Sequence, residues 1–339
     1  MQDIFYKLVD VKYSQVILTI VNTFTKQDYI NGGLIMYRVL VTDGMEASAI
    51  EKLKSLGYEV VEQFYEPEAL GEALQEFDVV VVRSATKIRK PIIDKALENP
   101  RLKLIIRGGV GVDNIDVAYA TEKGIKVSNT PNASSASVAE LALAHMFALA
   151  RFVNISNVTM REVKWEKKKY KGVEIAGKTL GLIGFGRIAR ELAKKASALG
   201  MKIVYHDIVG KAEGFDDYQY CEFEELLKKA DFLSLHIPLD KNKGTVIGKE
   251  EIALMKDGAY LINCARGGVV CEESLLEALN SGKISGAGID VFEEEPTKNE
   301  ELVNHRNVSV TPHIGGQTVE AQERIGEEIV SIIEEFFKK

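Results

Sequence analysis

The chain has 339 residues, of which 46% are hydrophobic and 27% are charged, and its formal net charge at pH 7 is −7. This length and composition are typical of a globular protein with about two domains. The negative charge gives no support for nucleic-acid binding, and no uninterrupted apolar run reaches the roughly 18 residues that a membrane span requires.

The three cysteines, Cys221, Cys264 and Cys271, have neither the spacing of metal ligands nor that of a disulfide framework. The sequence therefore predicts no metal site and favours a reducing, cytoplasmic location. No internal repeat or low-complexity tract is visible.

Residues 1–35 do not fit the pattern of the rest of the chain. Their apolar run at residues 16–21 is too short for a membrane span, and no clear small-residue cleavage site follows it. The codons of the glycine pair before Met36 can form a bacterial ribosome-binding site. We predict that residues 1–35 are a non-native extension; a real N-terminal strand or arm is the alternative.

From Met36 onward, apolar strand-like segments alternate with helical ones. The strands are predicted at residues 37–41, 58–62, 79–83, 104–106 and 125–128, with helices such as 47–56 and 91–96 between them. This alternation predicts a parallel sheet covered by helices.

A long apolar helix is predicted next, beginning at Ser137. The spacing of Ser137 and Glu140 fits a capping box. Residues 141–151 are almost wholly apolar, so we expect this helix to be buried on every side, against a domain or a second subunit.

A second alternating series predicts strands at residues 179–183, 202–206, 232–236, 259–263, 286–289 and 308–311. The final helix, residues 319–337, follows the end of this series and is expected to return to the first domain. The fold class is therefore α/β, with two doubly wound parallel-sheet domains. We predict one domain from residues 36–131 plus 315–339 and a second from residues 132–314.

The second series opens with a dinucleotide-binding pattern. Gly184, Gly186 and Ala189 follow the first strand, where they permit a tight turn, close approach to a pyrophosphate and helix packing. The next strand ends at Asp207, near the offset expected for an acid that binds the adenosine ribose. Such an acid favours NAD over NADP, because it repels a 2′-phosphate; the alternative for Asp207 is a solvated turn residue.

Three polar residues follow later strands of the same sheet. His313 can exchange a proton with a hydroxyl near neutral pH, and Glu295 can orient the imidazole. Arg266 can grip a carboxylate through two parallel hydrogen bonds. Surface ion pairs are the alternative for each residue, but together they indicate hydride transfer on a 2-hydroxy acid.

Two arginines, Arg83 and Arg107, end strands of the first series. Arg107 precedes Gly108 and Gly109, where backbone N–H groups can approach an anion. This pattern predicts a site for a second anionic group such as a phosphate. Ordinary surface charge is the alternative.

Over residues 36–337 the sequence resembles the D-isomer-specific 2-hydroxyacid dehydrogenase family, and within it most closely the phosphoglycerate dehydrogenases. The matching motifs are VRSATKI (82–88), GVDNID (111–116), NTPN (129–132), KWEKKKYKGVEIAGKTLG (164–181), NCARGG (263–268), DVFEEEP (290–296) and TPHIGG (311–316). The resemblance implies a flavodoxin-like substrate-binding domain, a Rossmann NAD-binding domain and a homodimer joined through the long helix region.

The resemblance also implies roles for individual residues. The catalytic set is Arg266, Glu295 and His313. The cofactor site is Val110, Gly184, Gly186, Arg187, Ile188, Asp207, His236, Ile237, Pro238, Cys264, Ala265, Arg266, Asp290, His313, Gly315 and Gly316. The substrate site is Arg83, Ser84, Arg107, Gly108 and Gly109.

The implied reaction is NAD-dependent oxidation of 3-phospho-D-glycerate to 3-phosphooxypyruvate, the first step of serine biosynthesis. Many phosphoglycerate dehydrogenases continue into a serine-binding regulatory domain, and we expect this chain to be a short form without one. Two alternatives stay open. One is a reductase for glyoxylate, hydroxypyruvate or another 2-oxo acid; the other is an NAD-sensing binding protein that resembles a corepressor.

Overall fold

The computed structural model describes residues 29–30, 33–34, 36–240 and 242–338. The predicted N-terminal extension therefore lies largely outside the described residues, apart from two short antiparallel strands, β1 (Tyr29–Ile30) and β2 (Gly33–Leu34). The chain divides into two compact units. Unit 1 runs up to Thr130 and resumes at Ile325, and unit 2 is Pro131–Arg324.

Unit 1 is built on a parallel sheet of five strands in the order β4-β3-β5-β6-β7. This order confirms the predicted flavodoxin-like arrangement. The strands are β3 (Arg38–Val41), β4 (Glu59–Glu62), β5 (Val79–Val82), β6 (Leu104–Arg107) and β7 (Lys126–Asn129). All four valines of β5 are buried, as expected for a central strand covered on both faces.

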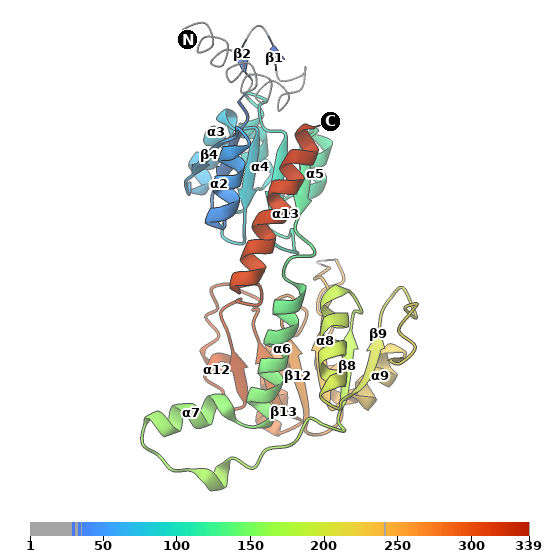
Figure 1. The fold of residues 1–339 in the computed structure, drawn as a ribbon. Coiled ribbons are helices and arrows are strands. Elements are labelled where there is room, and N and C mark those ends of the chain that lie inside the picture. Colours follow the sequence, from blue (N-terminus) through green and yellow to red (C-terminus); the bar gives the residue numbers. More distant parts are fainter. Residues whose placement is uncertain (1–28, 31–32, 35, 241, 339) are drawn as a thin grey trace, which may run out of the picture. The chain divides into compact units, whose positions relative to one another are not determined.

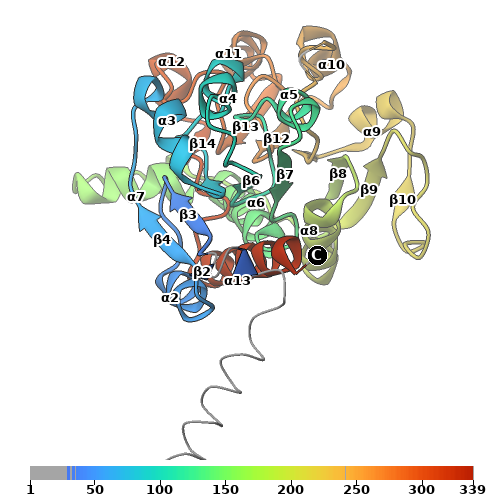
Figure 2. The ribbon, with the colours of Figure 1, turned by 90° about the horizontal axis from the view of Figure 1, so that it is seen from above.

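Four helices and a short 3-10 turn connect these strands, and the last helix of the chain joins them. The connecting elements are α2 (Ala47–Ser55), α3 (Pro67–Ala73), η2 (Leu74–Glu76), α4 (Lys90–Ala96) and α5 (Val117–Glu122). The last helix is α13 (Val319–Phe337), which lies beside α2 in Figures 1 and 2. A Cβ atom on Gly326 of α13 would lie 2.6 Å from the Cβ of Ala49 in α2, so the glycine permits this close packing.

Unit 2 contains a parallel sheet of seven strands in the order β10-β9-β8-β11-β12-β13-β14. This order confirms the predicted Rossmann arrangement, with the point of strand reversal between β8 and β11. The strands are β8 (Thr179–Ile183), β9 (Lys202–His206), β10 (Gln219–Tyr220), β11 (Phe232–Leu235), β12 (Ala259–Asn263), β13 (Ile284–Ile289) and β14 (Val308–Val310). The sequence did not predict β10, because two residues carry no periodic pattern.

The helices of unit 2 are α6 (Ser135–Ala150), α7 (Val153–Arg161), η3 (Lys167–Lys169), α8 (Arg187–Ala198), α9 (Phe223–Lys229), α10 (Lys249–Leu254), α11 (Glu272–Ser281) and α12 (Glu300–Val303). In Figure 1, α7 and the segment after it extend away from the sheet of this unit. No single helix in the described part of the chain is long and apolar enough to cross a membrane. Together, α6 and α7 have the length and composition of a membrane span. However, the pair is bent by 64°, and most of α6 is buried in the core of unit 2.

One expectation for α6 is wrong. The helix begins at Ser135, two residues before the predicted capping box, and Ser137 inside it shares a 2.8 Å hydrogen bond with Thr318 instead of capping the helix. Within the chain one side of the helix is exposed, so burial on every side stays a prediction that requires the second subunit. Glu140, Ala144 and Phe147 form one exposed stripe, at the three- and four-residue spacing of a single helix face.

The borders between the units differ from the predicted domain borders. The first lies at Thr130, one residue earlier, and the second at Arg324, ten residues later. Residues after the TPHIGG motif stay with unit 2, because the Arg324 side chain donates to the carbonyl of Ala133 at 2.8 Å.

Candidate active site

Three neighbouring strands of unit 2 end at the same edge of the sheet and carry the predicted catalytic residues. Arg266 follows β12, Glu295 follows β13 and His313 follows β14. In open α/β sheets ligands bind beyond this carboxyl edge. The fold therefore brings these side chains to one edge of the sheet, although Arg266 and His313 are 47 positions apart in the sequence.

His313 and Glu295 are in direct contact. His313 Nδ1 lies 2.8 Å from Glu295 Oε2, and the two side chains are 35% and 37% exposed, which leaves the imidazole accessible to a substrate. Burial raises the pKa of Glu295, but the hydrogen bond and charge of His313, the N–H of Phe292 and the charge of Arg266 outweigh it and lower the pKa overall. The carboxylate is therefore an anion facing the imidazole.

The backbone at His313 is held in an unusual conformation. Its φ angle is +53°, in the left-handed region that non-glycine residues rarely adopt. Asp290, only 1% exposed, fixes this turn: its carbonyl accepts from the N–H of His313, and its carboxylate accepts from those of Ile314 and Gly315 at 2.8 and 2.9 Å. The side chain predicted to be catalytic is thus positioned by the residue after β13.

Arg266 lies in a turn that a buried amide holds. The side chain of Asn263, at the end of β12, donates to the carbonyl of Arg266 at 2.9 Å and accepts from the N–H of Ala265 at 3.1 Å. The arginine Nη1 donates to the carbonyl of Ala265. Its positive charge reaches Glu295, whose pKa it helps to lower.

The dinucleotide pattern forms a turn that only glycine permits. Gly184 has a φ angle of +82°, and a Cβ atom there would lie 2.6 Å from the carbonyl oxygen of His236 after β11. Gly186 precedes α8, and a Cβ atom on it would meet nothing within 4 Å, so a side chain would fill open space before the helix N-terminus. The turn therefore fits a pyrophosphate at the N–H groups of α8.

Asp207 lies next to this turn. Its carboxylate accepts the N–H of Phe185 at 2.7 Å and that of Val209 at 3.1 Å. These bonds fix the carboxylate at the end of β9 and leave lone pairs for further donors. The position fits the predicted ribose contact, which stays a prediction.

Two groups that were predicted to contact the cofactor are uncharged, the partly exposed His236 and the buried Cys264. Burial lowers the pKa of His236 to about 4, and its Nε2 lies 3.0 Å from Ser234 Oγ. Burial, helped by the charge of Asp290, raises the pKa of the Cys264 thiol. Near neutral pH His236 is therefore a neutral imidazole and Cys264 a neutral thiol.

The predicted substrate residues lie together in unit 1. A Cβ atom on Gly109 would overlap the guanidinium of Arg107, and one on Gly108 would lie 3.7 Å from Cγ of Arg83. Both arginine side chains therefore flank this glycine pair at the ends of β5 and β6. Burial lowers the pKa of Arg83 despite the opposing charge of Asp43.

Two residues that sequence reasoning missed hold the segment after β5. Asp43 accepts the N–H groups of Arg83 and Thr86 at 2.7 and 3.0 Å, and Asn114 donates to the carbonyls of the same two residues. Asp43 lies two residues after the end of β3, and an acid at the end of a predicted strand was the signal that could have identified it. Val110, predicted to contact the cofactor, lies in unit 1, whereas the other predicted cofactor residues lie in unit 2.

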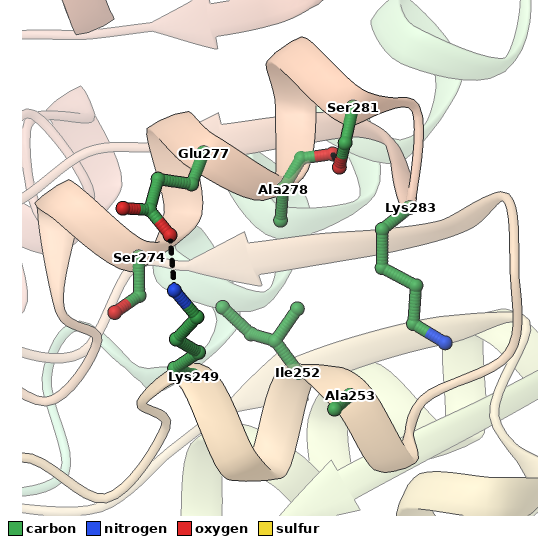
Figure 3. A pocket seen from close by; sticks show the side chains of 8 residues that line it. All are labelled: Lys249, Ile252, Ala253, Ser274, Glu277, Ala278, Ser281 and Lys283. Carbon is green, nitrogen blue, oxygen red and sulfur yellow. Dashed lines mark hydrogen bonds and ion pairs between the residues drawn. The ribbon is translucent and has the colours of Figure 1, made fainter.

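A surface pocket of unit 2 contains no predicted site residue. Figure 3 shows the Lys249–Glu277 ion pair, at 2.8 Å, on one side of an apolar floor between α10 and α11. The pocket is lined by Lys249, Ile252, Ala253, Ser274, Glu277, Ala278, Ser281 and Lys283.

The family follows from comparison with known proteins. The family model described as "D-isomer specific 2-hydroxyacid dehydrogenase, NAD binding domain" matches residues 143–315. The chain belongs to the D-isomer-specific 2-hydroxyacid dehydrogenases. The match confirms the predicted family and the cofactor NAD, and it makes the protein a member of an oxidoreductase family.

Relatives in this family carry different substrate names. The chain is 48% identical over 307 residues to a hydroxypyruvate reductase of Thermotoga maritima, covering 89% of this chain and 98% of that one. It is 46% identical over 307 residues to a D-3-phosphoglycerate dehydrogenase of Methanocaldococcus jannaschii, covering 90% of this chain but only 57% of that one.

A solved structure shows the same fold. The D-lactate dehydrogenase of Aquifex aeolicus, in complex with NAD and lactic acid, is 32% identical with a TM-score of 0.79, covering 88% of this chain and 95% of that one. The comparisons thus agree on the family and differ on the 2-hydroxy acid.

Proposed function

We propose that this dehydrogenase oxidises 3-phospho-D-glycerate to 3-phosphooxypyruvate with NAD, a reaction that would place it at the entry to serine biosynthesis in the cytoplasm. The observation that supports this choice of substrate is the position of Arg83 and Arg107 beside the glycine pair Gly108 and Gly109. Two guanidinium groups at one loop suit a phosphate, which a simple 2-oxo acid lacks. In this proposal unit 1 binds the phosphate of the substrate, and unit 2 binds the cofactor.

The proton chemistry follows from the His313–Glu295 pair. Because Nδ1 of His313 bonds to Glu295, its Nε2 is the atom that takes the proton of the substrate hydroxyl. Glu295, an anion with a lowered pKa, stabilises the imidazolium that forms. In the direction of reduction the same Nε2–H returns the proton.

Binding and orientation come from the remaining residues. Arg266 holds the substrate carboxylate and polarises the oxygen on C2. Bound NAD supplies the acceptor for the hydride that leaves C2. Asp207 binds the ribose and favours NAD over NADP, and Asp290 holds the carboxamide. The other proposed cofactor contacts are Val110, Gly184, Gly186, Arg187, Ile188, His236, Ile237, Pro238, Cys264, Ala265, Gly315 and Gly316.

A second candidate is reduction of hydroxypyruvate. It is supported by the relative with that name, of which this chain covers 98% at 48% identity. The candidate uses the same catalytic set, but it gives no role to the two arginines of unit 1.

Substrate kinetics with two arginine variants test the proposal. Each charge-assisted hydrogen bond is worth about 1.5–3 kcal/mol, so R83A and R107A should each lower kcat/KM for 3-phosphoglycerate by roughly 10–150-fold. Both variants should change kcat/KM for hydroxypyruvate and glyoxylate little. The exposed Arg306 in unit 2 gives a matched control, R306A, expected to affect neither substrate.

Equal losses on both kinds of substrate would favour hydroxypyruvate or another 2-oxo acid. A wild-type protein that binds NADH but turns over none of these acids would favour the NAD-sensing alternative.

We further propose a homodimer that covers the exposed stripe of α6. Phe147 in this stripe is 39% exposed, and the adjoining α7 exposes Val153, Val158 and Met160 by 50% or more. Such a run of exposed apolar side chains marks an interaction surface.

A further inference from the structure

A buried histidine joins a hydrogen-bond chain behind the candidate active site. His145 lies in α6 and is 2% exposed. Its Nδ1 is 2.9 Å from Ser309 Oγ, and its Nε2 is 3.1 Å from Thr311 Oγ1. Thr311 in turn donates to Asp290 Oδ1 at 2.6 Å. Four side chains therefore link the core of unit 2 to the carboxylate that holds the turn of His313.

The carboxylate of Asp290 determines which group donates in each of these hydrogen bonds. Asp290 already accepts the N–H groups of Ile314 and Gly315, so it acts as an acceptor throughout. Thr311 has one hydroxyl proton and donates it to Asp290, so it must accept from His145 Nε2. Burial lowers the pKa of His145 more than the charge of Asp290 raises it, so the imidazole is neutral. With its proton on Nε2, it accepts from Ser309 through Nδ1.

The sheet leaves space for this histidine at one position. A Cβ atom on Gly288 of β13 would lie 2.6 Å from the Cβ of His145. The helix α6 packs on β12, β13 and β14, and Figure 1 shows it in front of β12 and β13. The imidazole is thus held between helix and sheet with both ring nitrogens bonded.

We propose that His145 is a positioning residue for the turn 311–315. By donating to Thr311 it fixes the hydroxyl proton on Asp290, and through Asp290 it fixes the backbone on both sides of His313. The inference rests on the proposed dehydrogenase function, in which His313 moves the proton and Asp290 contacts the cofactor. It adds to that function a residue of the apolar helix that touches neither substrate nor cofactor.

Substitutions at position 145 test the proposal in the full chain. H145L removes both hydrogen bonds, whereas H145Q keeps a donor for Thr311 and an acceptor for Ser309. We expect H145L to lower kcat and NADH affinity by about two- to tenfold, the value of one neutral hydrogen bond, with KM for the 2-oxo acid changed less than twofold. H145Q should recover most of both losses. The control L149A, at another buried position of α6, should lower Tm without changing kcat or NADH affinity.

A double-mutant cycle separates positioning from general stability. If His145 acts through Thr311, then T311V and H145L/T311V should have the same kcat and the same dissociation constant for NADH, measured by fluorescence. Additive losses, or an H145L protein with wild-type kcat and NADH affinity, would overturn the proposal. A wild-type protein without turnover would refute the dehydrogenase function instead, and the NADH affinities of the four proteins would still decide the role of His145.

Discussion

At the scale of single residues, the anionic state of Glu295 has a consequence for the pH dependence of activity. The pKa of Glu295 is lowered, so the carboxylate stays ionised through the neutral range and stabilises the imidazolium of His313. Oxidation needs the unprotonated imidazole and reduction needs the protonated one. In the proposed mechanism the carboxylate therefore stabilises the imidazolium that oxidation forms and reduction consumes.

Replacing Glu295 by glutamine should move both pH profiles in the same direction. Without the anion the imidazolium loses its proton more readily, so the rising limb of oxidation and the falling limb of reduction should both move to lower pH. The measurement is kcat/KM against pH in each direction. Unchanged profiles would show that Glu295 does not govern the proton transfer.

A second residue-scale prediction concerns the choice of cofactor. The carboxylate of Asp207 is fixed by two backbone N–H groups at the end of β9. D207A should remove the ribose hydrogen bond and the repulsion of a 2′-phosphate, and so lower the NAD to NADP ratio of kcat/KM by at least tenfold. D216A, at an exposed acid that forms an ion pair with Lys211, is a control that should leave the ratio as it is.

At the scale of elements, the contact of α6 with β13 depends on the absence of a side chain at position 288. In G288A the new methyl group would meet His145 at 2.6 Å and Ile262 at 3.0 Å. Overpacking of this kind costs about 1–3 kcal/mol, so we expect a lower midpoint in denaturant unfolding. The double variant H145G/G288A, which removes the Cβ of residue 145, should be less destabilised than the sum of its single variants, and strict additivity would contradict the packing argument.

The sequence predicts the bounds of helices and strands well where a single hydrophobic pattern runs through the whole segment. The bounds of β8, β9, β12 and α13 agree with the prediction, because each is a continuous apolar or amphipathic run. The start of α6 is not predictable in this way. Its Ser137 fits a local capping rule, but the hydroxyl bonds to Thr318, 181 positions away.

The same limit applies to the candidate site. Arg266, Glu295 and His313 carry local signals, because each follows a predicted strand and belongs to a short motif. The chain from His145 to Thr311 joins residues 166 positions apart. A lone histidine in an apolar helix could be recognised as unusual, but its partners come only from the packing of α6 on the sheet.

At the scale of the whole molecule, the proposed homodimer can be tested apart from catalysis. F147E places a charge in the exposed stripe of α6 and should convert a dimer to a monomer, because an unpaired charge is costly in a desolvated interface. Light scattering after size-exclusion chromatography gives the mass. Phe64 in unit 1 is 53% exposed, and the control F64E should leave the mass unchanged. Equal masses of F147E and the wild type would place the interface elsewhere or show that the protein is monomeric.

The left-handed backbone at position 313 also bears on how this sequence can change over generations. A histidine there accepts a conformation with φ +53° that glycine or asparagine adopts at less cost, so the side chain proposed to transfer the proton is not the one that the fold prefers. A descendant released from catalysis would gain stability by replacing it with glycine. The residue at this one position is thus an indicator of selection for turnover, independent of which 2-hydroxy acid is used.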